Sequence, residues 1–401
     1  MTVPPLPHPS LLAIVHLPAC WHRIRTHRMK LPPLQALVWF TLISFATNCG
    51  AGGKIESECR KKSRKFAIVQ VHNPVTNQTY NTFNDSAMVH LRGKVTTVVI
   101  PSFFVVVFAI GLPANGLALW ILATRVKRLP STLLLMNLAV ADLLVLLGLP
   151  WRIAYHLLGN DWPFGEVFCR VSSAILYGNV YSSILFLTCI GADRYLAIVH
   201  PFFSKEVRNK RNALCLCGAV WLLLVLGMVP LYTTQLSHRI HTLNITTCYD
   251  SLPLEQLTAH YPYLIGTVVL GFMAPCLIVV FCYVSIIATL LMNEQRYGHA
   301  VVATLLVLLV FLVCLVPYNV ALLVQSYNRS SDVYYYAMIC LVVSTFSNCI
   351  DPFIYYYISE EFRNKLKSMI SAYMSETGTG KSDQSTVRSS THSQPKAPLL
   401  V

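Results

Sequence analysis

Four ionisable side chains interrupt long apolar stretches of this sequence. Asp142 and Asp351 each stand inside such a stretch, and the pair Asp193-Arg194 closes another. A charge is costly to place in a membrane, so ionisable residues there are usually functional. Asp142 and Asp351 could form a catalytic pair or line an ion path, as in a membrane enzyme or a transporter. The sequence shows neither a glycine-flanked catalytic aspartate nor repeat halves with broken helices, which argues against both activities.

Two cysteines are placed by the apolar segment that ends at Asp193-Arg194. Arg194 follows Cys169 by 25 residues, and a helix covers about 37 Å over that length, one full membrane crossing. We therefore expect Cys169 at the outer face and Arg194 at the inner face. Cys248 lies in the loop after the fourth apolar segment and is the natural partner of Cys169 in an oxidising compartment. The alternative is two free thiols.

Composition favours a protein with several membrane spans. The 401 residues are 55% hydrophobic and only 12% charged, whereas about a quarter of the residues of a soluble protein are charged. The net charge of +14 would suggest nucleic acid in a soluble protein. Here the basic residues cluster between apolar segments and in the first 65 residues, which indicates a topology signal and a basic leader, with no nucleic-acid partner. No CxxC pair or Cys/His cluster at zinc spacing occurs, so no metal-ligating cysteine site is expected.

Seven apolar segments of about 20 residues or more are each long enough to cross a hydrocarbon core. In lipid they must be helices, so the predicted fold class is an all-α membrane protein with a seven-transmembrane bundle. The spans are placed near 96–123, 131–158, 166–199, 211–233, 261–291, 298–326 and 333–357. Alternate loops are basic, which predicts an extracellular N-terminus in a multi-pass plasma membrane protein.

The segments outside the bundle have distinct compositions. Residues 1–46 are a leader and signal peptide, with Met29 as an alternative start; residues 47–94 are a polar, patternless extracellular tail; residues 95–358 are the bundle. Residues 359–371 have the helical spacing of an amphipathic eighth helix that lies on membrane lipid, and 372–401 is a disordered cytosolic tail. Four glycosylation sequons fall in segments expected outside: Asn77, Asn84, Asn244 and Asn328.

The order of short motifs over 96–371 resembles the rhodopsin-like, class A, G-protein-coupled receptors. The matching motifs are Asn115-Gly116, Leu138-Ala139-Val140-Ala141-Asp142, Asp193-Arg194-Tyr195, Trp221, Pro275 with Tyr283, Pro317, and Asp351-Pro352-Phe353-Ile354-Tyr355. The resemblance implies a receptor that signals through heterotrimeric G proteins and is not an enzyme.

That resemblance also implies roles for individual residues. A mid-membrane sodium pocket is implied at Asn115, Asp142, Ser183, Asn348 and Asp351, with a structural Na⁺ as the only cofactor. The alternative is a hydrogen-bonded network without an ion. Arg194, held by Asp193 beside Tyr195, is expected to release on activation, with Tyr283 and Tyr355 packing beneath it.

Three positions depart from the pattern of that class. Asp351 stands where most members have asparagine, and Leu315 replaces the aromatic residue two positions before Pro317. Tyr297 stands where an acid in span six would lock Arg194. The inactive state is therefore expected to be weakly held.

Longer matches resemble the protease-activated receptors within that class. They include Gly111-Leu112-Pro113-Ala114-Asn115-Gly116, Trp162-Pro163-Phe164-Gly165-Glu166, Asn244-Ile245-Thr246-Thr247-Cys248-Tyr249-Asp250 and Arg296-Tyr297-Gly298-His299-Ala300. This resemblance implies coupling to Gq-type and G12-type proteins. It also implies that an extracellular trypsin-like serine protease cuts the tail and exposes a tethered peptide ligand. A class A receptor for a diffusible peptide or lipid is the alternative.

A ligand pocket is predicted from residues near the outer ends of the spans. Its members are Tyr249, Asp250, Tyr318, Asn319, Tyr334 and Tyr335, with Asp250 as the contact for the ligand. The outer halves of spans six and seven carry no Lys or Arg before Arg329, which argues against a phosphate ligand. Tyrosines and amides suit a peptide with an aromatic anchor, although tyrosines at a bilayer interface can also be simple packing.

The activating cut is predicted at Arg64 or Lys65, inside a basic run that precedes an apolar one. A trypsin-like protease requires Arg or Lys for its acidic pocket. Cutting after Arg64 exposes the ligand Lys65-Phe66-Ala67-Ile68. The Pro-Arg of thrombin sites is missing, so other basic-site proteases are preferred. The alternative is a solvated basic run or a processing site of the secretory pathway.

The C-terminal tail is rich in Ser and Thr from Ser375 to Ser393. Phosphates on these residues would add negative charge to a basic, flexible segment, which suits an arrestin surface. The alternative is an ordinary polar tail.

Overall fold

The computed structural model describes residues 68–73, 78–83, 85–250, 252–253, 256, 260–292, 298–327 and 331–379. Several predictions fall on residues outside these ranges. They are the signal peptide, the cut at Arg64 or Lys65 with Phe66 and Ala67, the sequons Asn77, Asn84 and Asn328, the missing lock at Tyr297, and the tail from residue 380.

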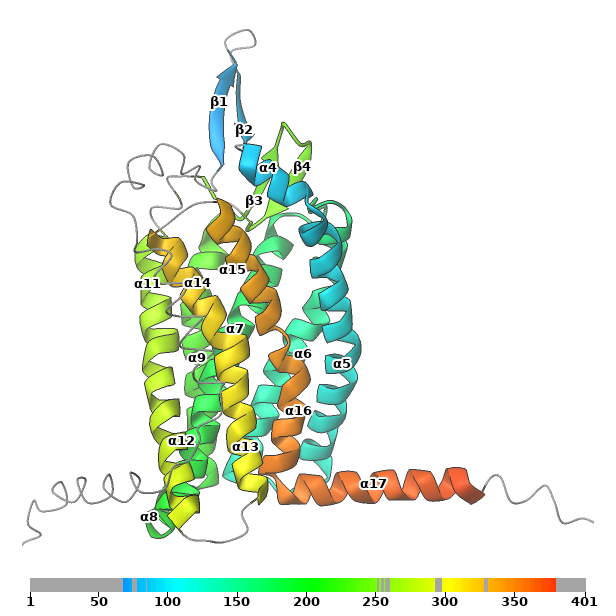
Figure 1. The fold of residues 1–401 in the computed structure, drawn as a ribbon, viewed down its shortest axis with the longest axis vertical. Coiled ribbons are helices and arrows are strands. Elements are labelled where there is room, and N and C mark those ends of the chain that lie inside the picture. Colours follow the sequence, from blue (N-terminus) through cyan, green and yellow to red (C-terminus); the bar gives the residue numbers. More distant parts are fainter. Residues whose placement is uncertain are drawn as a thin grey trace, which may run out of the picture. The chain divides into compact units, whose positions relative to one another are not determined.

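Within the described residues, seven helices are long and apolar enough to cross a membrane, so the predicted seven-helix fold is confirmed (Figure 1). The first four are α5 (Ile100–Thr124), α6 (Pro130–Leu157), α7 (Glu166–Val199) and α9 (Lys210–Thr233). The fifth comprises α11 (Tyr261–Val268), η2 (Val269–Met273) and α12 (Ala274–Met292). The sixth comprises α13 (Gly298–Leu309), η3 (Val310–Leu315) and α14 (Val316–Tyr327), and the seventh α15 (Ser331–Ser344) and α16 (Ser347–Ile358).

Two prolines explain the wide turns inside the fifth and sixth helices. Pro275 and Pro317 lack the N–H that would bond four residues back, to Gly271 and Val313. Both of those carbonyls lie in the π-helical turns η2 and η3. A π turn re-spaces the hydrogen-bond ladder at such a point and changes which face the next turn presents.

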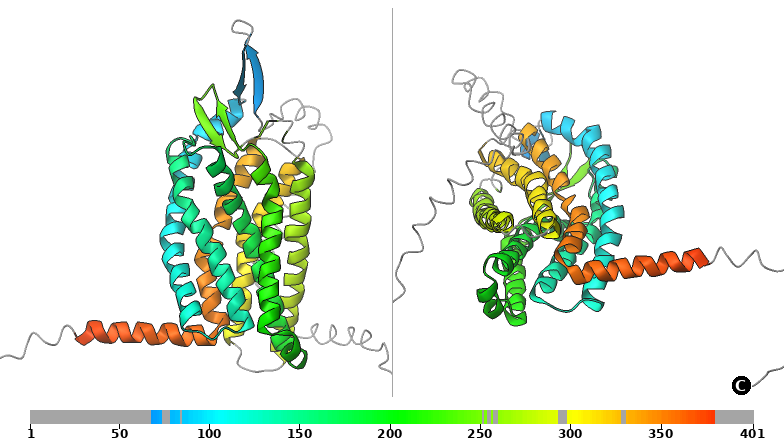
Figure 2. Two further views of the ribbon diagram at one scale, coloured as in Figure 1. Left: turned by 180° about the vertical axis from the view of Figure 1, so that it is seen from behind. Right: turned by 60° about the horizontal axis from the view of Figure 1, so that its bottom comes forward.

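α7 is the central helix of the bundle (Figure 2). In its most apolar window 72% of the residues are buried, against 28% in α9 and 22% in the fifth helix. Phe186, Ile184 and Leu187 of α7 are fully buried, whereas Leu222 and Leu270 on outer helices stay exposed. That pattern fits a lipid-facing surface, because apolar side chains need no burial against protein when the solvent is hydrocarbon.

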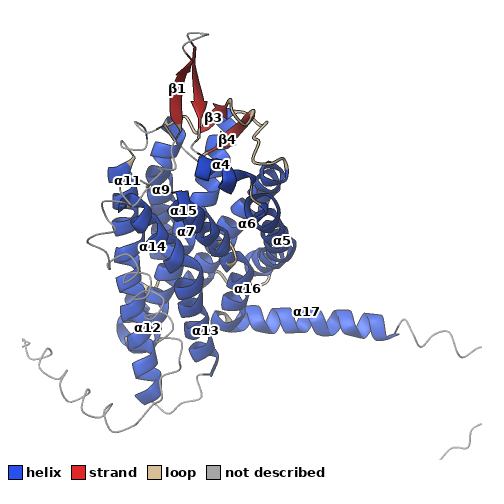
Figure 3. Cartoon of the chain, turned by 45° about the horizontal axis from the view of Figure 1, so that its top comes forward, coloured by secondary structure: helices blue, strands red, loops and turns tan. Residues whose placement is uncertain are grey.

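The N-terminal segment forms a folded cap at one end of the bundle, called the cap end (Figures 1 and 3). It comprises the antiparallel hairpin β1 (Val69–Asn73) and β2 (Gln78–Thr82), α4 (Asp85–Arg92) and η1 (Val95–Val99). A second hairpin, β3 (Ser237–Ile240) with β4 (Ile245–Cys248), lies beside it. The prediction of patternless chain is therefore wrong for this part of 47–94. The missed signal was the apolar–polar alternation of Val69, Gln70, Val71 and His72.

The opposite end of the bundle carries α8 (Pro201–Val207) and α17 (Glu360–Thr379). α17 lies across the direction of the spans and extends away from the bundle (Figure 1). It continues to Thr379, past the predicted end at residue 371. Phe362 anchors its first turn in the core, and Ile370 is exposed farther along.

Candidate functional site

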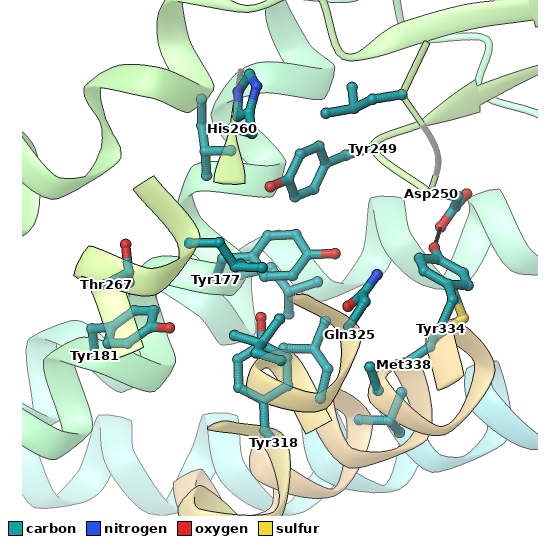
Figure 4. Close-up of a pocket in the computed structure, with 18 of the residues that line it drawn as sticks. Tyr177, Tyr181, Tyr249, Asp250, His260, Thr267, Tyr318, Gln325, Tyr334 and Met338 are labelled. Atoms are coloured by element: carbon teal, nitrogen blue, oxygen red, sulfur yellow. Dashed lines mark hydrogen bonds between the residues drawn. The ribbon is translucent and has the colours of Figure 1, made fainter. Parts of the chain in front are cut away.

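A cavity of about 160 Å³ opens among the helices at the cap end. Figure 4 shows tyrosines converging on it from α7, the loop after β4, the sixth helix and α15. The tyrosines that line it are Tyr177, Tyr181, Tyr249, Tyr263, Tyr318 and Tyr334. Their rings give large apolar contact area and their hydroxyls give a few polar points, a lining that suits an aromatic peptide side chain.

Asp250 places a carboxylate in the wall of this cavity. It is 5% exposed and accepts hydrogen bonds from the hydroxyls of Tyr155 and, at 3.0 Å, Tyr334. Tyr249 adopts a left-handed conformation, φ 64°, which turns the chain at this point. Burial raises the pKa of Asp250, while the two tyrosine hydrogen bonds and the charge of Arg152 act in the opposite direction.

Arg152 of α6 also lines the cavity, and sequence reasoning missed it. Its guanidinium donates to Ser173 Oγ at 2.7 Å and to the Cys248 carbonyl at 3.3 Å, and it lies 5.7 Å from the Trp162 ring centroid. Arg152 lies in the second span, whereas the exclusion of a phosphate ligand rested on spans six and seven. Because the cavity holds a guanidinium, the lack of Lys and Arg in those two spans does not exclude a phosphate ligand.

The six predicted pocket residues divide into two groups. Tyr249, Asp250, Tyr318 and Tyr334 line the cavity. Asn319 is fully buried elsewhere and donates to the Leu315 carbonyl at 2.9 Å. Tyr335 stacks on His90 of the cap with ring centroids 4.8 Å apart. Asn319 and Tyr335 each follow a cavity residue directly, and one helical step turns a side chain by about 100°.

A disulfide joins Cys169, in the first turn of α7, to Cys248 at the end of β4, with the two Cα atoms 5.7 Å apart. Because Tyr249 and Asp250 follow Cys248 directly, this bond positions both of them at the cavity. The Cys248 carbonyl contributes further by accepting from Arg152.

A buried polar cluster lies in the middle of the bundle, away from the cavity. Tyr355 donates to Asp142 Oδ2 at 3.0 Å and to Asn115 Oδ1 at 3.4 Å. Asn115 in turn donates to the Asn348 carbonyl at 2.7 Å. Asn179 and Asn348 exchange amide hydrogen bonds at 3.2 and 3.3 Å, so Asn179 is a member that the sequence did not single out.

The donor set of this cluster fits a small cation. Among the described residues, Asp142 Oδ1, both carboxylate oxygens of Asp351 and Ser183 Oγ are buried without a hydrogen-bond partner. Two neighbouring buried carboxyl groups repel each other when both are charged. A sodium ion or a shared proton would relieve that repulsion, and hard oxygen ligands are what such ions prefer.

At the opposite end, Asp193 is shared between two arginines. Arg208 takes both carboxylate oxygens, at 2.7 and 3.0 Å, and Arg194 lies 3.4 Å from Oδ2. Arg194 and Tyr283 border a hollow of about 270 Å³. Tyr195 contacts His200 Nε2 at 2.9 Å. Tyr355, predicted to pack beneath Arg194, donates instead to Asp142 and is not among the residues that line this hollow.

Comparison with known proteins identifies relatives for most of the bundle. Residues 114–355 match the model of the 7 transmembrane receptor (rhodopsin family). Proteinase-activated receptor 4 of Mus musculus is 46% identical over 290 residues, which cover 71% of this chain and 73% of that protein. Proteinase-activated receptor 4 of Homo sapiens is 44% identical over 289 residues (71% and 75%), and proteinase-activated receptor 3 of Rattus norvegicus is 38% identical over 317 residues (78% and 82%).

These matches confirm both resemblances drawn from the motifs. The members of the family are receptors and not enzymes, as the resemblance implied. Its helical bundle is a multi-pass membrane fold. The chain belongs to the rhodopsin family of seven-transmembrane receptors, among the proteinase-activated receptors.

Proposed function

We propose that a trypsin-like serine protease activates this receptor by cutting after Arg64, and that the exposed peptide beginning at Lys65 binds the tyrosine-lined cavity. The observation that carries the proposal is the buried carboxylate of Asp250 in the cavity wall, held by two tyrosine hydroxyls. A new chain terminus brings an ammonium group, and a buried carboxylate is its natural acceptor. The names of the relatives support activation by a proteinase.

The ligand and the cavity are complementary in chemistry. Phe66 would bring one aromatic ring, and Tyr177, Tyr318 and Tyr334 line the space that would receive it. Aromatic rings prefer offset or edge-to-face contacts of this kind. Because the peptide stays attached to the receptor, its effective concentration is roughly millimolar, so weak contacts suffice.

The orientation in the plasma membrane follows from charge and from the sequons. The basic loops after the first, third and seventh spans favour a cytosolic position for the end that carries α8 and α17. The cap end, with exposed Asn244 in the turn between β3 and β4, then faces outward. Glycosylation of Asn244 and of the sequons at Asn77, Asn84 and Asn328 belongs to the same proposal, as do lipid contact by α17 and arrestin binding by the Ser/Thr-rich tail.

Signalling would run from the cavity to Arg194. On activation Arg194 releases Asp193 and meets a heterotrimeric G protein, of Gq or G12 type by family resemblance, in the hollow that it borders with Tyr283. A sodium ion held by Asp142, Asp351 and Ser183, between the cavity and Arg194, would supply the counter-charge that these two carboxylates need. Tyr355 is linked to this cluster by its hydrogen bond to Asp142.

A double variant, Arg64→Gln plus Lys65→Gln, tests the cut. The expected result is loss of calcium release in response to trypsin, with the response to a soluble peptide of the ligand sequence retained. The matched control is Arg60→Gln plus Lys61→Gln, which removes the same charge from the same basic run. A double variant that still responds fully would eliminate this site. A wild-type receptor that responds only to an added diffusible ligand would contradict protease activation.

A further inference from the structure

The first described residue of the chain, Ile68, is already docked beside the cavity. Its backbone N–H donates to the Leu252 carbonyl at 3.3 Å, and it forms a parallel β-bridge with Pro253. The side chain of Ile68 is 3% exposed. Leu252 itself lines the cavity. Ile68 is therefore in direct contact with a residue of the cavity wall.

A small apolar core, separate from that of the bundle, holds Ile68 in place. Its other buried members are Phe83, Ala87 and Leu91 of the N-terminal cap and Ile240 of β3. Tyr334 packs against this core and also lines the cavity. Two residues, Leu252 and Tyr334, are therefore shared between the seat of Ile68 and the wall of the cavity.

Polar contacts fasten the cap to three other elements. Asn160, after α6, donates to the Leu91 carbonyl at 2.6 Å. The His241 backbone N–H donates to the Asn81 carbonyl at 3.1 Å. His90 lies 3.0 Å from Asp332 at the start of α15. Because these contacts spread over separate loops, loss of one would not free the cap.

We propose that Ile68, β1, β2 and α4 form a preassembled anchor, so that cleavage leaves only a three-residue overhang, Lys65–Ala67, free to enter the cavity. This inference rests on the proposed cut after Arg64. Ile68 was predicted as a ligand residue; in this account it is the fixed point from which the ligand extends, and it is not among the residues that line the cavity.

The anchor changes the effective length of the tether. An unanchored ligand would be attached through about 30 residues, from Lys65 to the start of the bundle near Val95. An anchored one is attached through about three, which reach roughly 10 Å when extended. Effective concentration falls with about the −3/2 power of tether length, so the two cases respond differently to the same insertion.

An insertion series measures that difference. Nine Gly/Ser residues placed between Ala67 and Ile68 lengthen an anchored tether from about 3 to about 12 residues, and the effective concentration of the ligand should then fall about eightfold. The same insertion lengthens an unanchored tether from about 30 to about 39 residues, and the effective concentration should fall only about 1.5-fold. The control is the same insertion after Val75, between β1 and β2. The readout is signal after complete cleavage, at receptor numbers low enough that signal tracks occupancy.

The anchored account predicts a loss of several-fold for the first insertion and none for the second. Equal, small losses at both positions would overturn it. The response of each variant to soluble ligand peptide, normalised to surface expression, separates a tether effect from misfolding.

A crosslink tests the docking without any protease. Ile68→Cys with Pro253→Cys should form a disulfide in the uncleaved receptor, because bridged neighbours lie about 5 Å apart, and each single variant is the control. After cleavage the crosslinked receptor should still signal. Failure to crosslink, or a crosslinked receptor that no longer responds while the single variants do, would overturn the anchor. A wild-type receptor that ignores protease would instead contradict the proposed function, and the crosslink would still report on docking.

Discussion

Replacing Arg208 with glutamine should lower signalling in the absence of ligand about fivefold. The reason lies in the shared carboxylate of Asp193. Arg208 binds both of its oxygens, at 2.7 and 3.0 Å, and Arg194 is left at 3.4 Å. Without Arg208, Asp193 has a single cationic partner, so Arg194 closes on it and the inactive arrangement gains stability.

The magnitude follows from the exposure of the groups. The side chains of Arg194 and Arg208 are 25% and 24% exposed, and that of Asp193 is 7% exposed. A partly exposed ion pair of good geometry contributes about 1 kcal/mol, the upper end of the range for surface pairs. Since 1.4 kcal/mol is a factor of ten, about 1 kcal/mol shifts the ratio of inactive to active receptor about fivefold.

The assay is basal G-protein activation at matched surface expression. Lys205→Gln is the control, because Lys205 is an exposed cation three residues away that makes no ion pair within the described part of the chain. Its basal signal should equal that of the wild type. An Arg208→Gln variant with unchanged or raised basal signalling would refute the view that Arg208 competes with Arg194 for Asp193.

Three further outcomes follow from the described contacts. Burial raises the pKa of Asp250, so its carboxylate gains a proton at a higher pH than usual. The protonated group no longer attracts an ammonium, and the potency of soluble ligand peptide should therefore fall as the medium is acidified. The Asp250→Asn variant, measured over the same pH range, should be weak throughout and should lack this component of the pH dependence; an unaltered profile would remove Asp250 as the acceptor. Tyr355→Phe leaves the buried Asp142 without its hydroxyl partner, which should cost roughly 1–3 kcal/mol of stability, seen as a lower melting temperature of the purified receptor; a melting temperature at or above that of the wild type would contradict this. Truncation after Ala372 should slow desensitisation after a protease pulse, and kinetics identical to those of the full chain would eliminate the phosphorylated tail as the arrestin site.

The sequence predicted the seven spans to within a few residues, because each is a long apolar segment bounded by charge. Its motifs also placed Asp142 and Asp193 in their spans, and the spacing to Arg194 placed Cys169 at the start of the third span, where it pairs with Cys248 of the loop after the fourth span. These are local signals, and a membrane fold expresses them directly.

The cap could not be predicted in the same way. Its strands are five residues long, and its stability comes from contacts with distant loops, such as Ile68 with Leu252 and Asn160 with Leu91. Short polar strands carry little intrinsic preference, since β-propensity mostly reflects packing.

Only part of the cavity lining was predicted, because the remaining residues also depend on contacts between distant segments. Tyr249, Asp250, Tyr318 and Tyr334 were identified, whereas Tyr177 of α7 was not. α7 is buried on most of its surface, so no apolar stripe indicates which of its faces meets the cavity. Arg152 was missed because its partners are a serine and a backbone carbonyl on other segments.

N-terminal sequencing of the surface receptor, before and after a trypsin pulse that triggers calcium release, tests the central claim most directly. The account predicts one new terminus, Lys65-Phe66-Ala67, whose appearance follows the same time course as the signal. Calcium release with no terminus at Lys65, or with a terminus that lies beyond Ile68 and so removes the overhang, would contradict the account.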